Sequence, residues 1–181
     1  MALFDETVRE FKRNGFAATE VAVVTERVGV SRGAFYVYFP GKEAVLRELL
    51  LREEKRIGSE VQPVIDRGAP LVEVLAAVVD SVLKAERRLG RRVVRDLCAL
   101  QFLPGPAGSH DVEDHPLALV LIAAMPARVP GLDAIHLTTV FLTGLFGLLA
   151  TDDGPVRERR CRIDLLVRLI SKGASTSYDC D

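Results

Sequence analysis

The chain has 181 residues, of which 49% are hydrophobic and 27% charged, and its formal net charge at pH 7 is −1. This composition supports a substantial apolar core and excludes a chain that is disordered throughout. The near-neutral charge excludes a protein that binds nucleic acids by bulk electrostatic attraction, so any such affinity must come from the local placement of charge and from dimerisation.

The segment from Thr19 to Leu46 predicts two short helices joined by a tight turn, followed by the start of a third. Val21, Val24 and Val28 are spaced by three and four residues, so they share one helix face that should point into a small core. Gly29 ends this helix at a position where a left-handed conformation costs least. Two short helices joined by a turn with glycine are the minimum of a helix-turn-helix, although two ordinary packed helices fit the pattern equally well.

The residues around the turn have separate predicted roles. Thr19 is expected to cap the first of the two helices, and Ser31 the second. Val30 is expected to fill the core at the turn. The second helix should extend from Arg32 to Phe39, and Pro40-Gly41 should end it.

One face of this second helix is predicted to be apolar and the other is suited to DNA. Phe35 and Phe39 are one turn apart and should face inward. Gly33 and Ala34 are small, which lets the helix approach base edges closely. The side chains that can donate hydrogen bonds to phosphates are Arg32, Tyr36, Tyr38 and Lys42.

A series of residues between Leu3 and Leu50 has the spacing of a known DNA-binding domain. The series comprises Phe11, Gly15-Phe16, Ala18-Thr19, Gly29-Val30-Ser31 and the ungapped run from Phe35 to Glu43. With these residues the chain resembles the TetR family of transcriptional regulators. The resemblance implies an all-α fold, with an N-terminal three-helix helix-turn-helix DNA-binding domain over residues 1–46. It further implies a helical effector-binding and dimerisation domain over residues 47–173 and a flexible tail over residues 174–181. The DNA-contacting set that it implies is Thr19, Ser31, Arg32, Gly33, Ala34, Tyr36, Tyr38 and Lys42.

Several features depart from the family pattern. Ala34 limits base readout at its position to apolar contact, for example with a thymine methyl group. Tyr38 stands where histidine is common, and Glu10 occupies a position that is often apolar, at the edge of the core. Residues 1–56 hold ten basic and nine acidic residues, and the chain starts almost at its first helix, without a short basic arm. Ala34, the near-neutral charge and the missing arm favour an alternative in which the protein is a TetR-like ligand-binding or interaction protein with weakened or lost DNA binding, whereas Arg32, Tyr36, Tyr38 and Lys42 favour DNA binding.

After this segment the chain is predicted to be helical throughout. The expected helices span residues 43–57, 71–88, 91–102, 116–127, 132–150 and 156–171, and residues rich in proline and glycine separate several of them. The helix over residues 116–127 is apolar on nearly all sides, which predicts that it is buried.

The last two of these helices are the candidates for a subunit interface. Residues 134–151 carry no formal charge and border on the length of a transmembrane helix, but a helix buried between its own domain and a partner subunit is the better interpretation. The resemblance implies a four-helix bundle across a homodimer, in which two recognition helices read two half-sites. The expected interface residues are Thr143, Gly144, Gly147, Leu148, Ile163, Leu166, Val167 and Ile170.

The interior between residues 71 and 127 is expected to hold a small, mostly apolar effector. The resemblance implies that binding changes the spacing of the two recognition helices, so the effector must bind the DNA-incompetent state more tightly. Candidate lining residues are Leu97, Cys98, Gln101, Phe102, Leu119 and Ile122. Each is also compatible with a plain core position, and Gln101 is the most suggestive because a polar group on an apolar helix needs a partner.

Other chemistry receives little support. The segment His110–His115 groups side chains that could bind a metal, and Cys98 could sense redox state, so a metal or redox sensor is a third possibility. A solvated turn and an inert core cysteine are the better interpretations. The sequence has no nucleophile with a base, no phosphate-binding glycine loop and no paired carboxylates, so it predicts neither an enzyme nor a cofactor nor a metal. Three cysteines without paired spacing and the lack of a secretory signal predict a cytoplasmic protein.

The sequence thus predicts a TetR-like, homodimeric transcriptional regulator, more in keeping with a repressor than an activator. It is expected to bind double-stranded operator DNA and to be released by a small-molecule effector.

Overall fold

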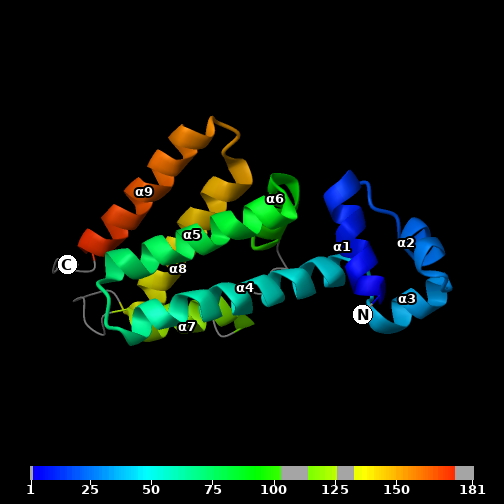
Figure 1. Cartoon of the computed structure of the whole chain (residues 1–181), viewed down its shortest axis with the longest axis horizontal. Helices are drawn as coiled ribbons and strands as arrows, with labels where there is room; N and C mark the ends of the chain where they lie inside the picture. The colour runs from blue at the N-terminus through cyan, green and yellow to red at the C-terminus, as the bar shows by residue number, and fades with distance from the viewer. Residues whose placement is uncertain (1, 103–113, 126–132, 174–181) are drawn as a thin grey trace.

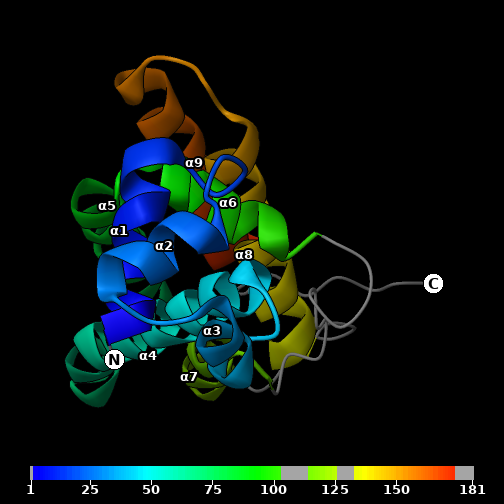
Figure 2. The ribbon, with the colours of Figure 1, turned by 90° about the vertical axis from the view of Figure 1, so that its right-hand side faces the viewer.

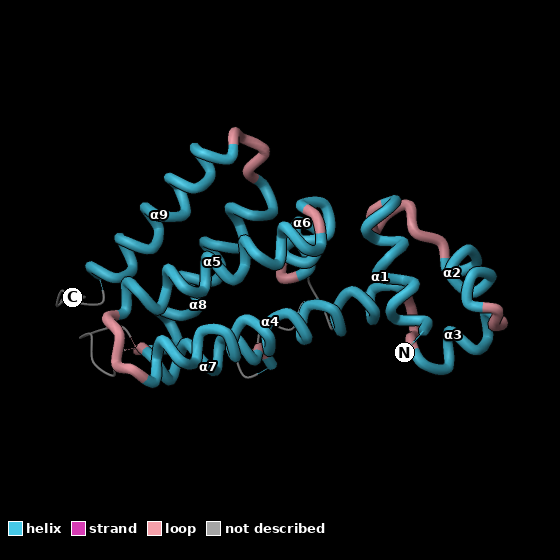
Figure 3. The backbone as a smooth tube through the Cα atoms, viewed as in Figure 1, coloured by secondary structure: helices cyan, strands magenta, loops and turns pink. Residues whose placement is uncertain are grey.

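The computed structural model describes residues 2–102, 114–125 and 133–173, and within them every regular element is a helix (Figures 1 and 3). The predicted all-α fold is confirmed. The helices are α1 (Ala2–Asn14), α2 (Val21–Val28), α3 (Arg32–Tyr38), α4 (Lys42–Asp66), α5 (Leu71–Leu89), α6 (Arg91–Leu100), α7 (Pro116–Ala124), α8 (Ala134–Thr151) and α9 (Val156–Gly173). The predicted tail over residues 174–181 lies outside the described residues.

Helix α4 connects the two parts of the molecule (Figure 1). Helices α1 to α3 lie at its N-terminal end, and α5 and α7 pack along the rest of its length. The sequence predicts an end at residue 57, but the helix continues to Asp66 because Val61 is fully buried in the core. The predicted domain boundary after residue 46 falls inside this continuous helix and stays a prediction. The later helix ends differ from the predicted ones by one to three residues.

The three-helix end of the molecule is built around aromatic side chains. Phe11 and Phe35 are fully buried, and the ring centroid of Phe35 lies 5.7 Å from that of Phe39. Gly29 ends α2 in the left-handed conformation at φ 75°, as predicted. Ser31 caps α3, as predicted, with its Oγ accepting a hydrogen bond from the backbone N–H of Ala34 at 3.1 Å.

Two predictions for this end are wrong. The N-cap of α2 is Glu20 rather than Thr19, and no side-chain hydrogen bond caps this helix. Thr19 instead turns inward, where its hydroxyl donates to the carbonyl oxygen of Gly15 at 2.8 Å. Val30 is 37% exposed and does not fill the core, because the turn places it on the outer side.

Acidic residues of α1 are buried against α2. Glu10 is 2% exposed, deeper than the predicted core edge, and its carboxylate accepts hydrogen bonds from Arg27, Arg13 and Asn14. Glu6 lies one turn earlier and binds Arg9, whose hydrogen bond lowers the pKa of the Glu6 carboxyl below its ordinary value. A buried carboxylate is tolerated when charged donors surround it, so these ion pairs fix α1 to α2.

Helix α8 is buried along one side in the second part of the molecule. By length and composition it could cross a membrane, but it packs against α6, α7 and α9, with Phe141, Leu145 and Leu149 buried. The prediction that α7 is a buried helix is right for one of its sides only. Leu117 and Leu121 face the core, whereas the opposite side exposes 48% of Leu119.

A buried ion pair joins the last helix to the rest. Arg159 of α9 is 4% exposed and forms a bidentate contact with Glu86 of α5, at 2.7 Å and 2.6 Å. Two parallel N–H···O bonds give this contact strength and a fixed geometry. The pair therefore sets how α9 lies across α5.

We expect Glu86→Leu to lower the free energy of unfolding by about 3 kcal/mol, because it leaves the Arg159 guanidinium buried without its carboxylate. The double variant Glu86→Leu/Arg159→Leu should regain most of that loss, since two apolar side chains need no ionic partner. Urea unfolding of the native protein, the single variant and the double variant measures both effects. A double variant no more stable than the single one would contradict this account of the pair.

Candidate nucleic-acid interface

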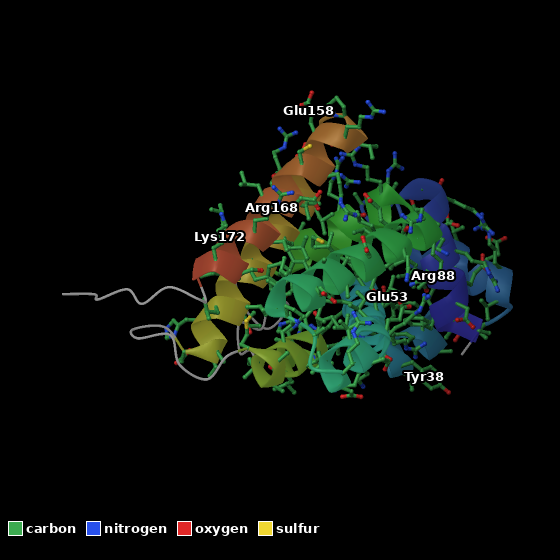
Figure 4. The ribbon with its side chains drawn as sticks, turned by 60° about the vertical axis from the view of Figure 1, so that its left-hand side comes forward. Tyr38, Glu53, Arg88, Glu158, Arg168 and Lys172 are labelled. Carbon is green, nitrogen blue, oxygen red and sulfur yellow. The ribbon has the colours of Figure 1, made fainter. Side chains whose placement is uncertain are left out.

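The outer face of α3 is an exposed surface at the three-helix end. Figure 2 views the molecule from this end, with α1 to α3 in front of the other helices. Side chains on this face are largely open to solvent, with Tyr36 55%, Val37 81% and Tyr38 72% exposed. Ser31, Arg32 and Gly33 are also exposed, and Ala34 is half-buried. Figure 4 shows Tyr38 at this end of the molecule and Lys172 at the other.

Core packing decides which face of α3 turns outward. Phe35 is the buried residue of the helix, and its ring meets that of Tyr36 edge-on at 5.6 Å. Because Phe35 is locked in the core, the helix cannot rotate without losing that burial. The predicted DNA-contacting residues Ser31, Arg32, Gly33, Tyr36 and Tyr38 are thereby brought together on the outer side.

Arg32 carries the positive charge of α3. Within the described residues its guanidinium forms no ion pair, whereas Arg9, Arg13 and Arg27 of the neighbouring helices bind Glu6 and Glu10. Arg32 is therefore the basic side chain placed to meet a phosphate without first leaving a carboxylate.

Lys42 is not free to bind DNA as predicted. Its ammonium group donates to the carbonyl oxygens of Phe16, Ala17 and Thr19, at 2.9, 2.9 and 3.1 Å. It also lies 4.8 Å from the centroid of the Phe16 ring, a cation–π contact. All three N–H donors of the side chain are thus satisfied, and Lys42 ties the start of α4 to the α1–α2 turn.

Thr19 is also removed from the predicted DNA-contacting set by its position. It is 3% exposed, and its hydroxyl is bound to Gly15 as described above. Its carbonyl oxygen is one of those held by Lys42. Thr19 therefore stabilises the turn that carries α2 instead of facing a ligand.

Val37 lies on the outer face of α3 but was left out of the predicted DNA-contacting set, although it has the largest exposed fraction of the large hydrophobic residues in the described part of the chain. The spacing of Val37 from Gly33 could have indicated this role. Val37 follows Gly33 by four residues, so the two share one helix face, and Gly33 was already assigned to DNA.

A second candidate site lies between α4, α5, α6, α7 and α8. It is a small apolar cavity of about 40 Å³, and a larger pocket of about 240 Å³ lies beside it, with Leu50 on the walls of both. The cavity is lined by Leu50, Glu53, Glu54, Ile57, Val82, Ala85, Leu89, Val94, Leu97, Cys98, Leu117 and Phe146. The pocket is lined by Arg47, Leu50, Leu51, Leu100, Gln101, Asp114 and His115.

Half of the predicted effector-binding set lines these spaces. Leu97 and Cys98 line the cavity and Gln101 lines the pocket. Phe102 and Leu119 are each 48% exposed, because they lie on the outer sides of their segments, and they line neither space. Ile122 is half-buried and also lines neither.

Glu54 was missed by the sequence analysis and is the polar centre of this region. It is 3% exposed, and its Oε1 lies 3.0 Å from Nδ1 of His115 and 3.4 Å from Nε2 of Gln101. Because Glu54 lines the cavity while His115 and Gln101 line the pocket, their hydrogen bonds lie where the two spaces meet. The partner that Gln101 was expected to need is therefore Glu54.

The structure gives no support to the metal or redox alternative in the part of the chain that it describes. No group of three potential metal ligands is found there, His115 faces Glu54, and residues 110–113 lie outside it. Burial raises the pKa of the Cys98 thiol to about 12. Such a thiol holds almost no thiolate at neutral pH and is a poor nucleophile.

The predicted interface residues of α8 and α9 differ in how far they are buried. Ile163 and Val167 are buried within the subunit, and Gly144 is covered by Leu166, since a Cβ on this glycine would lie 3.0 Å from that side chain. The apolar residues open to a partner are instead Val140, Leu165 and Leu169, more than half exposed, with exposed Thr143 and a Gly147 that has open space beside it. Leu148 and Ile170 are half-buried.

Replacing Arg32 and Lys42 separates a contact with DNA from a contact within the protein. We expect Arg32→Ala to leave the free energy of unfolding unchanged. It should reduce the slope of log K for DNA binding against log salt concentration by about one unit per subunit, because one phosphate contact is lost. Lys42→Met should lower the free energy of unfolding by about 2 kcal/mol, because three carbonyl groups lose a charged donor. Thermal unfolding measures the stability of each variant, and fluorescence anisotropy over a salt series measures its binding to DNA. A Lys42→Met protein of native stability would contradict the role of Lys42 as a contact within the protein.

Comparison with known proteins agrees with this geometry. Residues 3–49 match the family described as "Bacterial regulatory proteins, tetR family". Over 175 residues the chain is 26% identical to the HTH-type transcriptional repressor KstR of Mycolicibacterium smegmatis, covering 93% of this chain and 84% of that protein. Over 40 residues it is 45% identical to YerO of Bacillus subtilis, an uncharacterized HTH-type transcriptional regulator, covering 22% of this chain and 14% of that protein.

Solved structures show the same fold along the whole chain. The FadR repressor of Thermus thermophilus, a TetR family protein solved in complex with lauroyl-CoA, aligns with a TM-score of 0.77 at 19% identity, over 99% of this chain and 96% of that one. RolR, solved without ligand, aligns with a TM-score of 0.62 at 15% identity, over 99% of this chain and 98% of that one. Residues 3–49 are therefore a helix-turn-helix domain of the tetR regulatory-protein type, and the chain as a whole has the fold of these TetR-like structures.

Proposed function

We propose that the protein is a cytoplasmic repressor that binds double-stranded operator DNA as a homodimer and is released by a small amphipathic effector. The observation that carries the proposal is the outer face of α3. It presents Arg32, Tyr36 and Tyr38 to solvent while Phe35 holds the helix in the core. Helices presented in this way dock in the major groove, with base edges beside them and phosphates on both sides.

A homodimer is supported by the uncovered side of α8 and α9. Val140, Thr143 and Gly147 are spaced by three and four residues, so they form one line along α8. Leu165 and Leu169 form a second line one turn apart on α9. Two copies related by a two-fold axis would bury both lines in a four-helix interface and place one α3 over each of two operator half-sites, about 34–36 Å apart.

An amphipathic effector is supported by the two adjoining spaces. The small cavity has walls of Leu, Ile, Val and Phe side chains that match an apolar chain, and at about 40 Å³ it must widen to admit one. Glu54, His115 and Gln101 offer polar contacts where the cavity meets the larger pocket. The structural neighbour solved with lauroyl-CoA, which joins a twelve-carbon acyl chain to a polar group, supports an acyl thioester as the first ligand to test.

Coupling between this site and DNA is supported by α6. The helix carries Leu97 and Cys98 on the cavity wall and Arg92 and Asp96 nearer its N-terminus. Arg92 donates to the carbonyl oxygen of Asn14 at 3.1 Å, and Asp96 accepts from the backbone N–H of Phe16 at 3.3 Å. An effector that displaces α6 would therefore pull on the α1–α2 turn and reorient α3, which is how differential binding to two states becomes release of DNA.

The tightness of this contact supports the coupling. Gly15 adopts φ +83°, and a Cβ at this position would lie 2.7 Å from Cδ of Arg92. The same turn is held from the other side by Lys42, which binds the carbonyl oxygen of Phe16. Because the α1–α2 turn is held on both sides, a shift of α6 should move the whole turn instead of only bending it.

Specific binding of DNA tests the proposal as a whole. We expect the native protein to retard the DNA that flanks its own coding region, to protect two half-sites with two chains bound, and to be displaced by dodecanoyl-CoA. Gel-shift and footprinting experiments measure this, and the Arg32→Ala/Tyr36→Ala double variant should lose the complex. A folded dimer that binds dodecanoyl-CoA but no specific DNA would support instead a ligand-binding protein that has lost its operator.

Asp96 tests the coupling. We expect Asp96→Ala to bind operator and dodecanoyl-CoA with nearly native affinities but to require about five-fold more effector for release, because the contact with Phe16 is lost. Asp96→Asn is the matched control, since its amide oxygen can still accept that hydrogen bond. Anisotropy titrations of a preformed operator complex give the midpoints. Release of Asp96→Ala at the native effector concentration would refute this route.

A further inference from the structure

The outer face of α3 has an apolar line at its centre. Val37 is 81% exposed, although nothing in the isolated subunit compensates for the exposure of its two methyl groups. Gly33 has no Cβ, and Ala34 offers only a methyl group. The centre of the recognition surface therefore holds no side chain that can form a hydrogen bond with a base.

Helical geometry places Val37 directly opposite the core. An α-helix turns by about 100° per residue, so Val37 lies about 200° around the helix from the buried Phe35. Gly33 and Ala34 lie within about 60° of Val37 by the same geometry. Tyr36 and Tyr38 diverge by about 100° to either side of it. With α3 in a groove, the tyrosines therefore face the two walls and Val37 faces the floor.

We infer that Val37 reads the 5-methyl group of a thymine near the centre of each operator half-site. The inference rests on the proposed function and names the chemistry that the recognition helix selects. Thymine is the base that presents a methyl group in the major groove, whereas guanine, adenine and cytosine present hydrogen-bonding groups at the corresponding places. A valine packed on those groups would remove their water without replacing it, which is unfavourable.

Gly33 and Ala34 make the contact possible. Without longer side chains one turn before Val37, the backbone of α3 can come close enough to the groove floor for a short side chain to touch a base. Arg32, Tyr36 and Tyr38 would then position the helix through phosphates. In this arrangement phosphate contacts supply affinity, and the apolar contact of Val37 supplies selection.

Deoxyuridine substitution tests the inference, because it removes the thymine methyl group and leaves every hydrogen-bonding group of the base pair in place. The duplex is the one that the native protein enriches from a random-sequence library, with each thymine replaced singly. We expect one or two thymines per half-site at which replacement weakens binding on the order of four-fold, the effect of one buried methyl group. In Val37→Ala this penalty should disappear.

Val156→Ala is the matched control. Val156 is 70% exposed at the start of α9, a helix that lies away from α3 (Figure 1), so its truncation should leave the deoxyuridine penalty unchanged. Both variants change exposed side chains, and circular dichroism checks that they fold as the native protein does.

The outcomes separate the inference from the proposed function. Sequence-specific binding without a thymine sensitive to deoxyuridine, or a penalty that persists in Val37→Ala, overturns the role of Val37 and leaves the repressor proposal standing. Failure of the native protein to enrich any sequence overturns both.

Discussion

The ammonium group of Lys42 holds the α1–α2 turn, and the arrangement of the DNA-binding end depends on this contact. Three carbonyl oxygens converge on Nζ from a segment more than twenty residues away in the chain. The turn therefore belongs as much to α4 as to α1. Because α4 continues as one helix to Asp66, the position of α3 is linked to the second part of the molecule through a stiff element and not through a flexible linker.

The same turn meets α6 from the other side. Arg92 and Asp96 bind its backbone, and the two residues directly after Asp96, Leu97 and Cys98, line the apolar cavity. A single helix thus contacts both the candidate effector site and the base of the DNA-binding domain. This continuity gives a physical route for regulation that needs no long chain of side-chain movements.

The DNA-binding end has little positive charge free to contact DNA. Residues 1–56 are nearly neutral, and several of their arginines are held by the buried carboxylates Glu6 and Glu10. These ion pairs stabilise the packing of α1 on α2 and withdraw positive charge from the surface. Exposed tyrosines and Arg32 remain for phosphate contacts, so the geometry of α3 must contribute more to DNA recognition than general attraction does.

Local chemistry in the sequence determined the helices, the left-handed Gly29, the Ser31 cap and the inward position of Phe35, because helix periodicity, capping and glycine conformation depend on neighbouring residues. The exposed side of α3 followed from the same periodicity. The tertiary structure alone decided the roles of Lys42, Thr19 and Glu54, and the burial of Ile163 and Val167 inside the subunit. Their partners come from distant segments, and a hydrogen bond or an apolar contact between distant segments exists only after the chain has folded them together.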